Sequence, residues 1–240
     1  MIIYVVKKGD TLTSIANLYE TTPEFLATQN GININDSLVV GQTIVIPQYN
    51  EKLGKIATNG YLYTNIDENV LRETLPYLTF ATIFTYGFTE SGELIYADDE
   101  RVLNIIKEYN VKPIMLISTL TEEGRFSNEL SNKILNDINS QNILIDNILQ
   151  NMREKGYFGL DIDFEYVFPE DKDAYVAFIE NVTTKLNNEG YPVIVSLAPK
   201  TSSTQPGLLY ESHDYEAIGA IANAVLLMTY EWGYTLLHTR

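Results

Sequence analysis

The chain has 240 residues, of which 45% are apolar and 20% charged, and its 32 acidic side chains outnumber 16 basic ones, giving a formal net charge of −16. This composition is typical of a globular protein with one large or two smaller domains. The acidity and the lack of a basic stripe argue against nucleic acid and anionic membranes as partners. Cysteine is absent, which excludes disulfides and thiolate metal sites.

Two further features bear on location. No apolar run reaches the roughly 20 residues that span a bilayer. The first eight residues, MIIYVVKK, place both lysines after a short apolar stretch, which is not the pattern of a secretion signal. We therefore expect no membrane insertion. If the protein acts outside the cytoplasm, we expect it to reach that location by release or by assembly onto a particle.

The first fifty residues predict a strand, two helices and a second strand. Residues 3–6 form a short apolar strand, and a turn then leads into a helix over 11–19 with one apolar face. The next helix, over 22–30, begins with a threonine cap followed by proline and is ended by a glycine. Residues 41–47 close this unit as a strand that ends in proline.

These residues resemble a LysM module through YVVKKGDTLTSIA at 4–16, Asn-Gly at 30–31 and GQTIVIP at 41–47. The resemblance implies binding of N-acetylglucosamine-containing polysaccharide, peptidoglycan or chitin, in a groove between the loops at 9–12 and 31–36. The alternative is that these loops only form a turn and a helix cap. The residues that the resemblance implicates are Gly9, Asp10, Thr11, Leu12, Asn30, Gly31 and Ile32.

We expect the LysM-like module to occupy residues 1–48, a polar linker 49–57 and a second domain 58–240. In the second domain, short apolar runs rich in β-branched and aromatic residues alternate with helical patterns. Strands separated by helices imply a parallel sheet. This α/β pattern predicts a (β/α)8 barrel of the TIM type, with a doubly wound open sheet as the alternative. The expected strands are 58–63, 78–84, 111–117, 159–164, 192–197 and 224–228, and the expected helices are 98–109, 142–155 and 171–188.

Residues 159–165, GLDIDFE, place three carboxylates at two-residue spacing inside an apolar run. Because side chains alternate along a strand, Asp161, Asp163 and Glu165 share one face. In a barrel the apolar face would pack against the helices and the acids would point inward, with Glu165 nearest the mouth, where active sites lie. The neighbouring acids should raise the proton affinity of Glu165, which makes it a candidate proton donor.

Two other interpretations of the acidic strand stay open. A calcium loop of this type needs glycine at its sixth position, where Tyr166 stands. A solvated edge strand would leave Ile162 and Phe164 exposed to water. We therefore expect no metal and no other cofactor. His213 and His238 lack the spacing of metal ligands, and we expect His213 to begin a helix.

GLDIDFE resembles the signature strand of glycoside hydrolase family 18, and MTYEWG over 228–233 resembles the sixth-strand motif of the same family. With the LysM-like module in front, the chain is similar to spore cortex-lytic N-acetylglucosaminidases of endospore-forming bacteria. The resemblance implies substrate-assisted, retaining hydrolysis of β-1,4 bonds, in which the 2-acetamido oxygen of the sugar attacks its own anomeric carbon. No enzyme nucleophile is then needed.

The same resemblance assigns roles to individual residues. Glu165 would be the general acid and then the base for water, and Asp163 would stabilise the acetamido nitrogen. Asp161 would hold Asp163, and Tyr230 would hydrogen-bond the acetamido oxygen. The residues expected to contact the sugar, from the sixth-strand motif and from strand ends, are Met228, Glu231, Trp232, Tyr61 and Tyr86.

The chain departs from the family pattern in three places. Phe158 and Glu231 stand where the family commonly has aspartate, and 58–240 contains six candidate strands, whereas a complete barrel takes roughly 250 residues. Two hypotheses therefore stand: a hydrolase of peptidoglycan, or a non-catalytic glycan-binding protein with an inactive, truncated barrel. By resemblance alone we expect a location at the spore coat, cortex or cell wall. The oligomeric state and the bond cleaved stay open.

Overall fold

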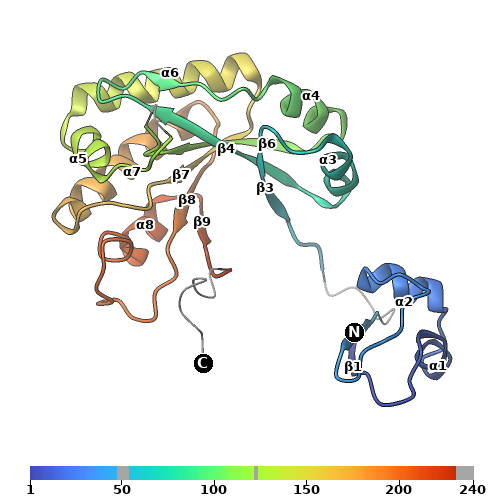
Figure 1. Cartoon of the computed structure of the whole chain (residues 1–240). Helices are drawn as coiled ribbons and strands as arrows, with labels where there is room; N and C mark the ends of the chain where they lie inside the picture. Colours follow the sequence, from blue (N-terminus) through green and yellow to red (C-terminus); the bar gives the residue numbers. More distant parts are fainter. Residues whose placement is uncertain (48–53, 122–123, 231–240) are drawn as a thin grey trace. The chain divides into compact units, whose positions relative to one another are not determined.

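The computed structural model describes residues 1–47, 54–121 and 124–230. The chain divides into two compact units, Met1–Ile56 and Ala57–Arg240, each with its own hydrophobic core. Figure 1 shows both units as ribbons. Most of the predicted linker falls on residues outside the described ranges.

The first unit has the predicted order of strand, helix, helix, strand. The strands β1 (Ile2–Val5) and β2 (Thr43–Ile46) pair antiparallel, and the helices α1 (Leu12–Leu18) and α2 (Pro23–Asn30) lie between them in the chain. Each helix begins where a threonine side chain caps a backbone N–H, as the sequence predicts. The core of this unit consists of Val6, Leu12, Ile15, Ala16, Leu26, Ala27, Ile44 and Ile46.

The second unit is built on a curled parallel sheet whose strands follow one another in chain order, as expected for part of a (β/α)8 barrel. Figure 1 shows the helices α4, α6 and α7 on the outer side of this sheet. In the described part of the chain, the first and last strands of this order each pair on one side only. The parallel strands are β3 (Asn59–Tyr63), β4 (Phe80–Phe88), β6 (Lys112–Ser118), β7 (Gly159–Asp163), β8 (Val193–Leu197) and β9 (Ala224–Leu227), and the short β5 (Leu94–Ile95) pairs antiparallel with β4.

Helices cover the outer face of the sheet, and the three predicted ones are present as α4 (Glu100–Glu108), α6 (Ile138–Lys155) and α7 (Lys172–Asn188). The sequence did not predict α3 (Glu68–Thr74), because it is a short helix with one buried residue and so lacks an apolar stripe. For α8 (Tyr215–Ile221) the sequence predicted only that a helix begins near His213. None of the helices in the described ranges could cross a membrane. The remaining elements are α5 (Asn128–Asn136) and the 3-10 turns η1 (Leu75–Tyr77) and η2 (Pro169–Asp171).

The outward side chains of β7 and of Phe164, the residue that follows it, anchor the sheet to its helices. Leu160, Ile162 and Phe164 are completely buried. The Phe164 ring stacks on Tyr175 and Phe178 of α7, with ring centroids 5.8 and 5.4 Å apart. This packing fixes the face of β7, so the alternate residues of the strand must point into the curled sheet.

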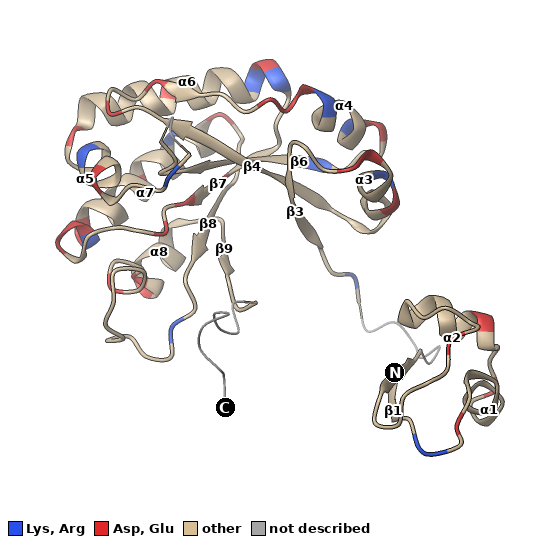
Figure 2. Cartoon of the chain, in the orientation of Figure 1, with Lys and Arg blue, Asp and Glu red and all other residues tan. Residues whose placement is uncertain are grey.

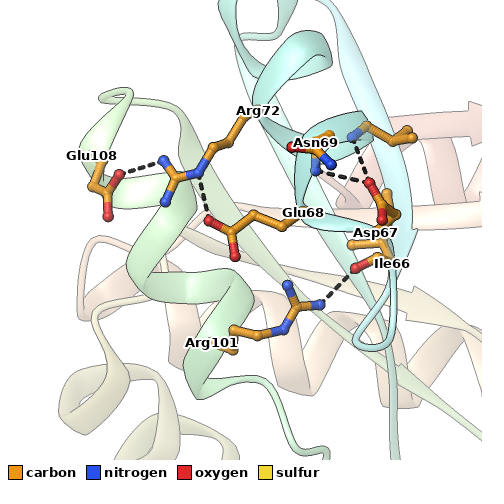
Figure 3. A network of polar contacts seen from close by, with 8 residues as sticks. Ile66, Asp67, Glu68, Asn69, Arg72, Arg101 and Glu108 are labelled. Carbon is orange, nitrogen blue, oxygen red and sulfur yellow. Dashed lines mark hydrogen bonds and ion pairs between the residues drawn. The ribbon is translucent and has the colours of Figure 1, made fainter.

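The helix α3 follows β3 and is held by polar contacts (Figure 3). Asp67 caps the first turn, and the Arg72 guanidinium donates to Glu108 at the end of α4 at 2.6 Å. Arg101 of α4 donates to the carbonyl of Ile66 at 2.7 Å. These contacts tie the loop after β3 to α4, and β3 supplies tyrosines to the pocket described next.

Candidate active site

The inner face of β7 carries the predicted acids. Asp161 is completely buried and Asp163 is 5% exposed, whereas Glu165 lies two residues beyond the end of the strand and is half-buried. In Figure 2, red for Asp and Glu lies mainly on helices and loops, and it also marks the end of β7. The structure thus brings the three acids together on one side of the sheet.

Asp163 and Glu165 open into a pocket of about 300 Å³ at the carboxyl ends of the strands. This volume is at the lower end of the range of roughly 300–1,000 Å³ for small-molecule pockets. Half of the lining residues are aromatic, and the rings of Tyr63 and Phe84 pack edge to face with their centroids 5.3 Å apart. The full lining is Tyr61, Leu62, Tyr63, Phe84, Phe126, Asp163, Glu165, Ser196, Met228 and Tyr230.

Asp161 lies beneath this pocket and accepts two hydrogen bonds. The Tyr61 hydroxyl donates to its Oδ2 at 2.5 Å, and the Ser196 hydroxyl donates to its Oδ1 at 3.0 Å. Burial raises the pKa of Asp161 to about 6, although the two hydrogen bonds favour the ionised form and act in the opposite direction. Burial and the neighbouring Asp161 charge also raise the pKa of Tyr61, so Tyr61 stays a hydrogen-bond donor.

Tyr86, which the sequence places among the sugar contacts, lies elsewhere. It is completely buried, and its hydroxyl donates to Asp99 on the outer side of the sheet. The reason is a shift in the pairing of β4 with β6 between Ile83 and Tyr86. Such a bulge reverses the alternation of side chains, so Tyr86 does not share the inward face of Phe84. The interpretation of Tyr86 as a sugar contact is therefore wrong.

The other predicted site residues divide into two groups. Tyr61, Met228 and Tyr230 line the pocket together with the acids. Glu231 and Trp232 lie outside the described residues. Among the described residues, no group of three or more His, Asp or Glu side chains is arranged to hold a metal ion.

The pocket residues that sequence reasoning did not assign include Ser196, Phe84 and Phe126. Ser196 and Phe84 could have been found from the alternation along their strands, because Val195 and Ile83 are buried on the outer face. Phe126 comes from the loop between β6 and α5, where no periodic pattern indicates the direction of a side chain.

The first unit has a groove of about 310 Å³ between the two predicted loops. Asp10 lies in it and accepts from the Tyr4 hydroxyl at 2.8 Å and the Lys7 amide at 2.7 Å, which lowers the pKa of Asp10. The groove is lined by Asp10, Thr11, Leu12, Thr13, Pro23, Glu24, Ile34, Asp36, Ser37 and Leu38.

Four residues that the LysM resemblance implicates do not line this groove. The Asn30 amide bonds both the N–H and the C=O of Val45, so it joins α2 to β2. Gly31 ends α2 in the left-handed conformation with φ 61°, and Gly9 forms a turn with φ 93°. Ile32 packs against the core. These four positions serve the fold of the module, and the groove itself begins at Asp10.

Comparisons with known proteins agree with this architecture. The model of the LysM domain matches residues 4–47, and that of glycosyl hydrolases family 18 matches residues 57–237. A cortical fragment-lytic enzyme of Bacillus subtilis (strain 168) is 39% identical, with 98% of this chain and 67% of the relative covered. The Bacillus anthracis enzyme of the same name is 36% identical over 97% of this chain and 66% of its own length.

A solved structure gives the same result in three dimensions. The Bacillus cereus spore cortex-lytic enzyme SleL superposes with a TM-score of 0.72 and 35% identity, covering 97% of this chain and 54% of SleL. The chain thus spans about two thirds of the curated relatives that it matches and about half of that solved structure. From its fold and its matching residues, the chain belongs to glycosyl hydrolases family 18 and carries a LysM domain.

Proposed function

We propose that this chain hydrolyses β-1,4 glycosidic bonds in N-acetylglucosamine-containing polysaccharide, with peptidoglycan of the spore cortex as the substrate. The observation that carries the proposal is the acid row of β7, which ends in Glu165 at an aromatic-walled pocket. Two relatives that are 39% and 36% identical to the chain over the aligned residues are named cortical fragment-lytic enzymes. An aromatic pocket with a few convergent polar groups suits a sugar ring.

In the proposed reaction, Glu165 gives its proton to the glycosidic oxygen as the bond to the anomeric carbon breaks. The 2-acetamido oxygen of the substrate attacks that carbon and forms a cyclic oxazolinium ion. Asp163, which is 5% exposed, stabilises the positive charge that develops on the acetamido nitrogen. Glu165 then takes a proton from the water that opens the ring, which restores both groups.

Asp161 and Tyr230 have supporting roles in this scheme. Asp161 is fixed by hydrogen bonds from Tyr61 and Ser196. The role proposed for it, by the family resemblance, is to hold Asp163. Tyr230 lines the pocket and donates a hydrogen bond to the acetamido oxygen, orienting it for attack. The apolar walls of the pocket, which include Met228, would contact the sugar faces. The family resemblance assigns the same role to Glu231 and Trp232.

The direct test is incubation of the chain with purified peptidoglycan fragments and with chitin oligomers, followed by mass spectrometry of the new reducing ends. We expect cleavage on the reducing side of an N-acetylated sugar. Binding of fragments without any new reducing end would contradict the proposal and support the non-catalytic alternative.

We also propose that the LysM groove binds the glycan and retains the chain at the cell wall or spore cortex. The groove has an apolar side chain, Ile34, that is 43% exposed and therefore available to a sugar face. Loops on a rigid scaffold are where recognition is concentrated.

Replacing Ile34 with Ser should weaken retention on insoluble peptidoglycan in a sedimentation assay, because the substitution removes apolar contact area. Cleavage of short soluble oligomers should not change. Val39→Ser is the control, because Val39 is 68% exposed and lies outside the groove. Equal retention of both variants would show that the groove is assigned wrongly.

A further inference from the structure

The segment that carries Glu165 lies outside the sheet. The last parallel pairing of β7 joins Asp163 to Ser118 of β6, and the pairing with β8 already ends at Ile162. The strand pairing of β7 therefore ends before Phe164. Buried carbonyl groups need other donors, and these donors also determine where the Glu165 carboxylate points.

His213 supplies the donor immediately before Glu165. Its Nε2 lies 3.1 Å from the Phe164 carbonyl oxygen, and its Nδ1 accepts from the Ala198 amide at 2.9 Å. Because an amide N–H can only donate, Nδ1 must be unprotonated and Nε2 must carry the hydrogen. Burial lowers the pKa of His213 to about 4, so the neutral ring persists at neutral pH.

The carbonyls after Glu165 are held in a similar way. The Ser131 hydroxyl from α5 is shared between two carbonyl oxygens, that of Tyr166 at 3.0 Å and that of Asn128 at 2.8 Å. The Ser212 hydroxyl lies 3.0 Å from the Val167 carbonyl oxygen and 2.8 Å from that of Phe168. Both serines are buried. The backbone on each side of Glu165 is thus attached to other elements by side chains.

Residues 212–213 are themselves fixed to the end of β8. The Lys200 ammonium donates to the His213 carbonyl at 2.6 Å, and the Tyr215 hydroxyl donates to the Ala198 carbonyl at 2.5 Å. The Lys200 amide donates in turn to the Tyr215 hydroxyl at 3.0 Å. The imidazole therefore links the Phe164 carbonyl after β7 to the Ala198 amide after β8. The loop that carries His213 is itself hydrogen-bonded to residues 198–200.

We infer that His213 is a positioning residue for Glu165, acting through the Phe164 carbonyl, with Ser212 as a second fixed point on the other side of the acid. This inference rests on the proposed function, in which Glu165 donates the proton. A catalytic acid displaced by about 1 Å can lose about 100-fold in rate. The two ring nitrogens of His213 bond backbone groups of Phe164 and Ala198, so its proposed effect on catalysis passes through the backbone.

Two amide variants of different length separate positioning from general stability. In His213→Gln the amide nitrogen can reach the place of Nε2 and keep the bond to Phe164, whereas His213→Asn can keep only the acceptor for Ala198. We expect His213→Asn to lower kcat about 10- to 100-fold with little change in KM, and His213→Gln to retain most of kcat. Ser212→Ala should lower kcat less than His213→Asn does.

The control for stability is Tyr157→Phe, which removes a buried hydroxyl bonded to Asp99; neither residue lines the pocket. It should lower the melting temperature without lowering kcat. If His213→Gln and His213→Asn lose kcat equally, or if the loss follows melting temperature across all four variants, positioning by His213 is wrong.

A second measurement does not depend on turnover. Hydrogen exchange of the peptide covering residues 164–168 should become faster in His213→Asn and stay near the wild-type rate in His213→Gln. Unchanged exchange in both variants would overturn the inference. Absence of hydrolysis by the wild-type chain would instead refute the proposed function, and exchange alone would then decide whether His213 holds this segment.

Discussion

Replacing Glu165 with Gln should lower kcat for glycan cleavage by about 10²- to 10⁴-fold, the range in which a general acid contributes. The amide is nearly isosteric with the carboxyl group but cannot transfer a proton to the glycosidic oxygen. Since Glu165 is half-buried at the pocket and outside the strand ladder, the fold should tolerate the change. Binding of the intact oligomer should persist.

The measurement is release of reducing ends under single-turnover conditions, with oligomer binding determined separately by calorimetry. Glu170→Gln is the matched control, because Glu170 is an exposed residue of η2 in the segment that follows. Equal rates for wild type and Glu165→Gln would remove Glu165 from its role as proton donor. Loss of binding along with turnover would indicate a structural role instead.

Replacing Asp161 with Asn should have opposite effects on stability and on activity. The pKa of Asp161 is raised from 3.8 to about 6 in the folded chain because the carboxyl group is completely buried. Folding therefore favours the protonated carboxyl group of Asp161. The stability that this preference adds to the folded chain is fully present below pH 3.8 and is lost as the pH rises through about 6. At about 1.4 kcal/mol per pKa unit, ionised Asp161 lowers the free energy of unfolding by up to roughly 3 kcal/mol above that pH.

The Asn amide removes this buried charge and can still accept from the Tyr61 hydroxyl. We therefore expect Asp161→Asn to melt at a higher temperature than wild type at pH 8, with a smaller difference at pH 5. Activity should fall, since the support beneath Asp163 is weakened. Such an exchange of stability for function is common at active sites.

Thermal unfolding at both pH values, read by circular dichroism, checks this prediction. Asp173→Asn, an exposed position at the start of α7, controls for the loss of one negative charge. A difference in melting temperature that does not depend on pH, or a variant less stable at pH 8, would contradict the account of Asp161.

The barrel strands and the acid row could be predicted because their signal is local. Two-residue alternation in GLDIDFE determines which side chains share a face, and the apolar face must be buried. The longest helices were also predictable, since Phe178, Val182 and Leu186 of α7 repeat at helical spacing and are all buried. These features depend on neighbours within one element.

The remaining features depend on contacts between distant segments. A bulge in β4 turned Tyr86 outward, and nothing in the residues around it signals the shift in pairing. His213 does precede a helix, as expected, because Asp214 is the N-cap of α8. Its bond to Phe164, however, joins residues 49 positions apart in the chain. Single-sequence patterns carry no such information, which is why the positioning of Glu165 required the structure.

The central claim is that the acid row works with the acetamido group of the substrate rather than with an enzyme nucleophile or a single attack by water. The most direct measurement is the anomeric configuration of the first sugar product. Proton NMR can monitor it while the wild-type chain cleaves an N-acetylglucosamine oligomer. Two successive displacements at the anomeric carbon predict initial formation of the β anomer. Initial formation of the α anomer, or no product at all, would contradict this mechanism.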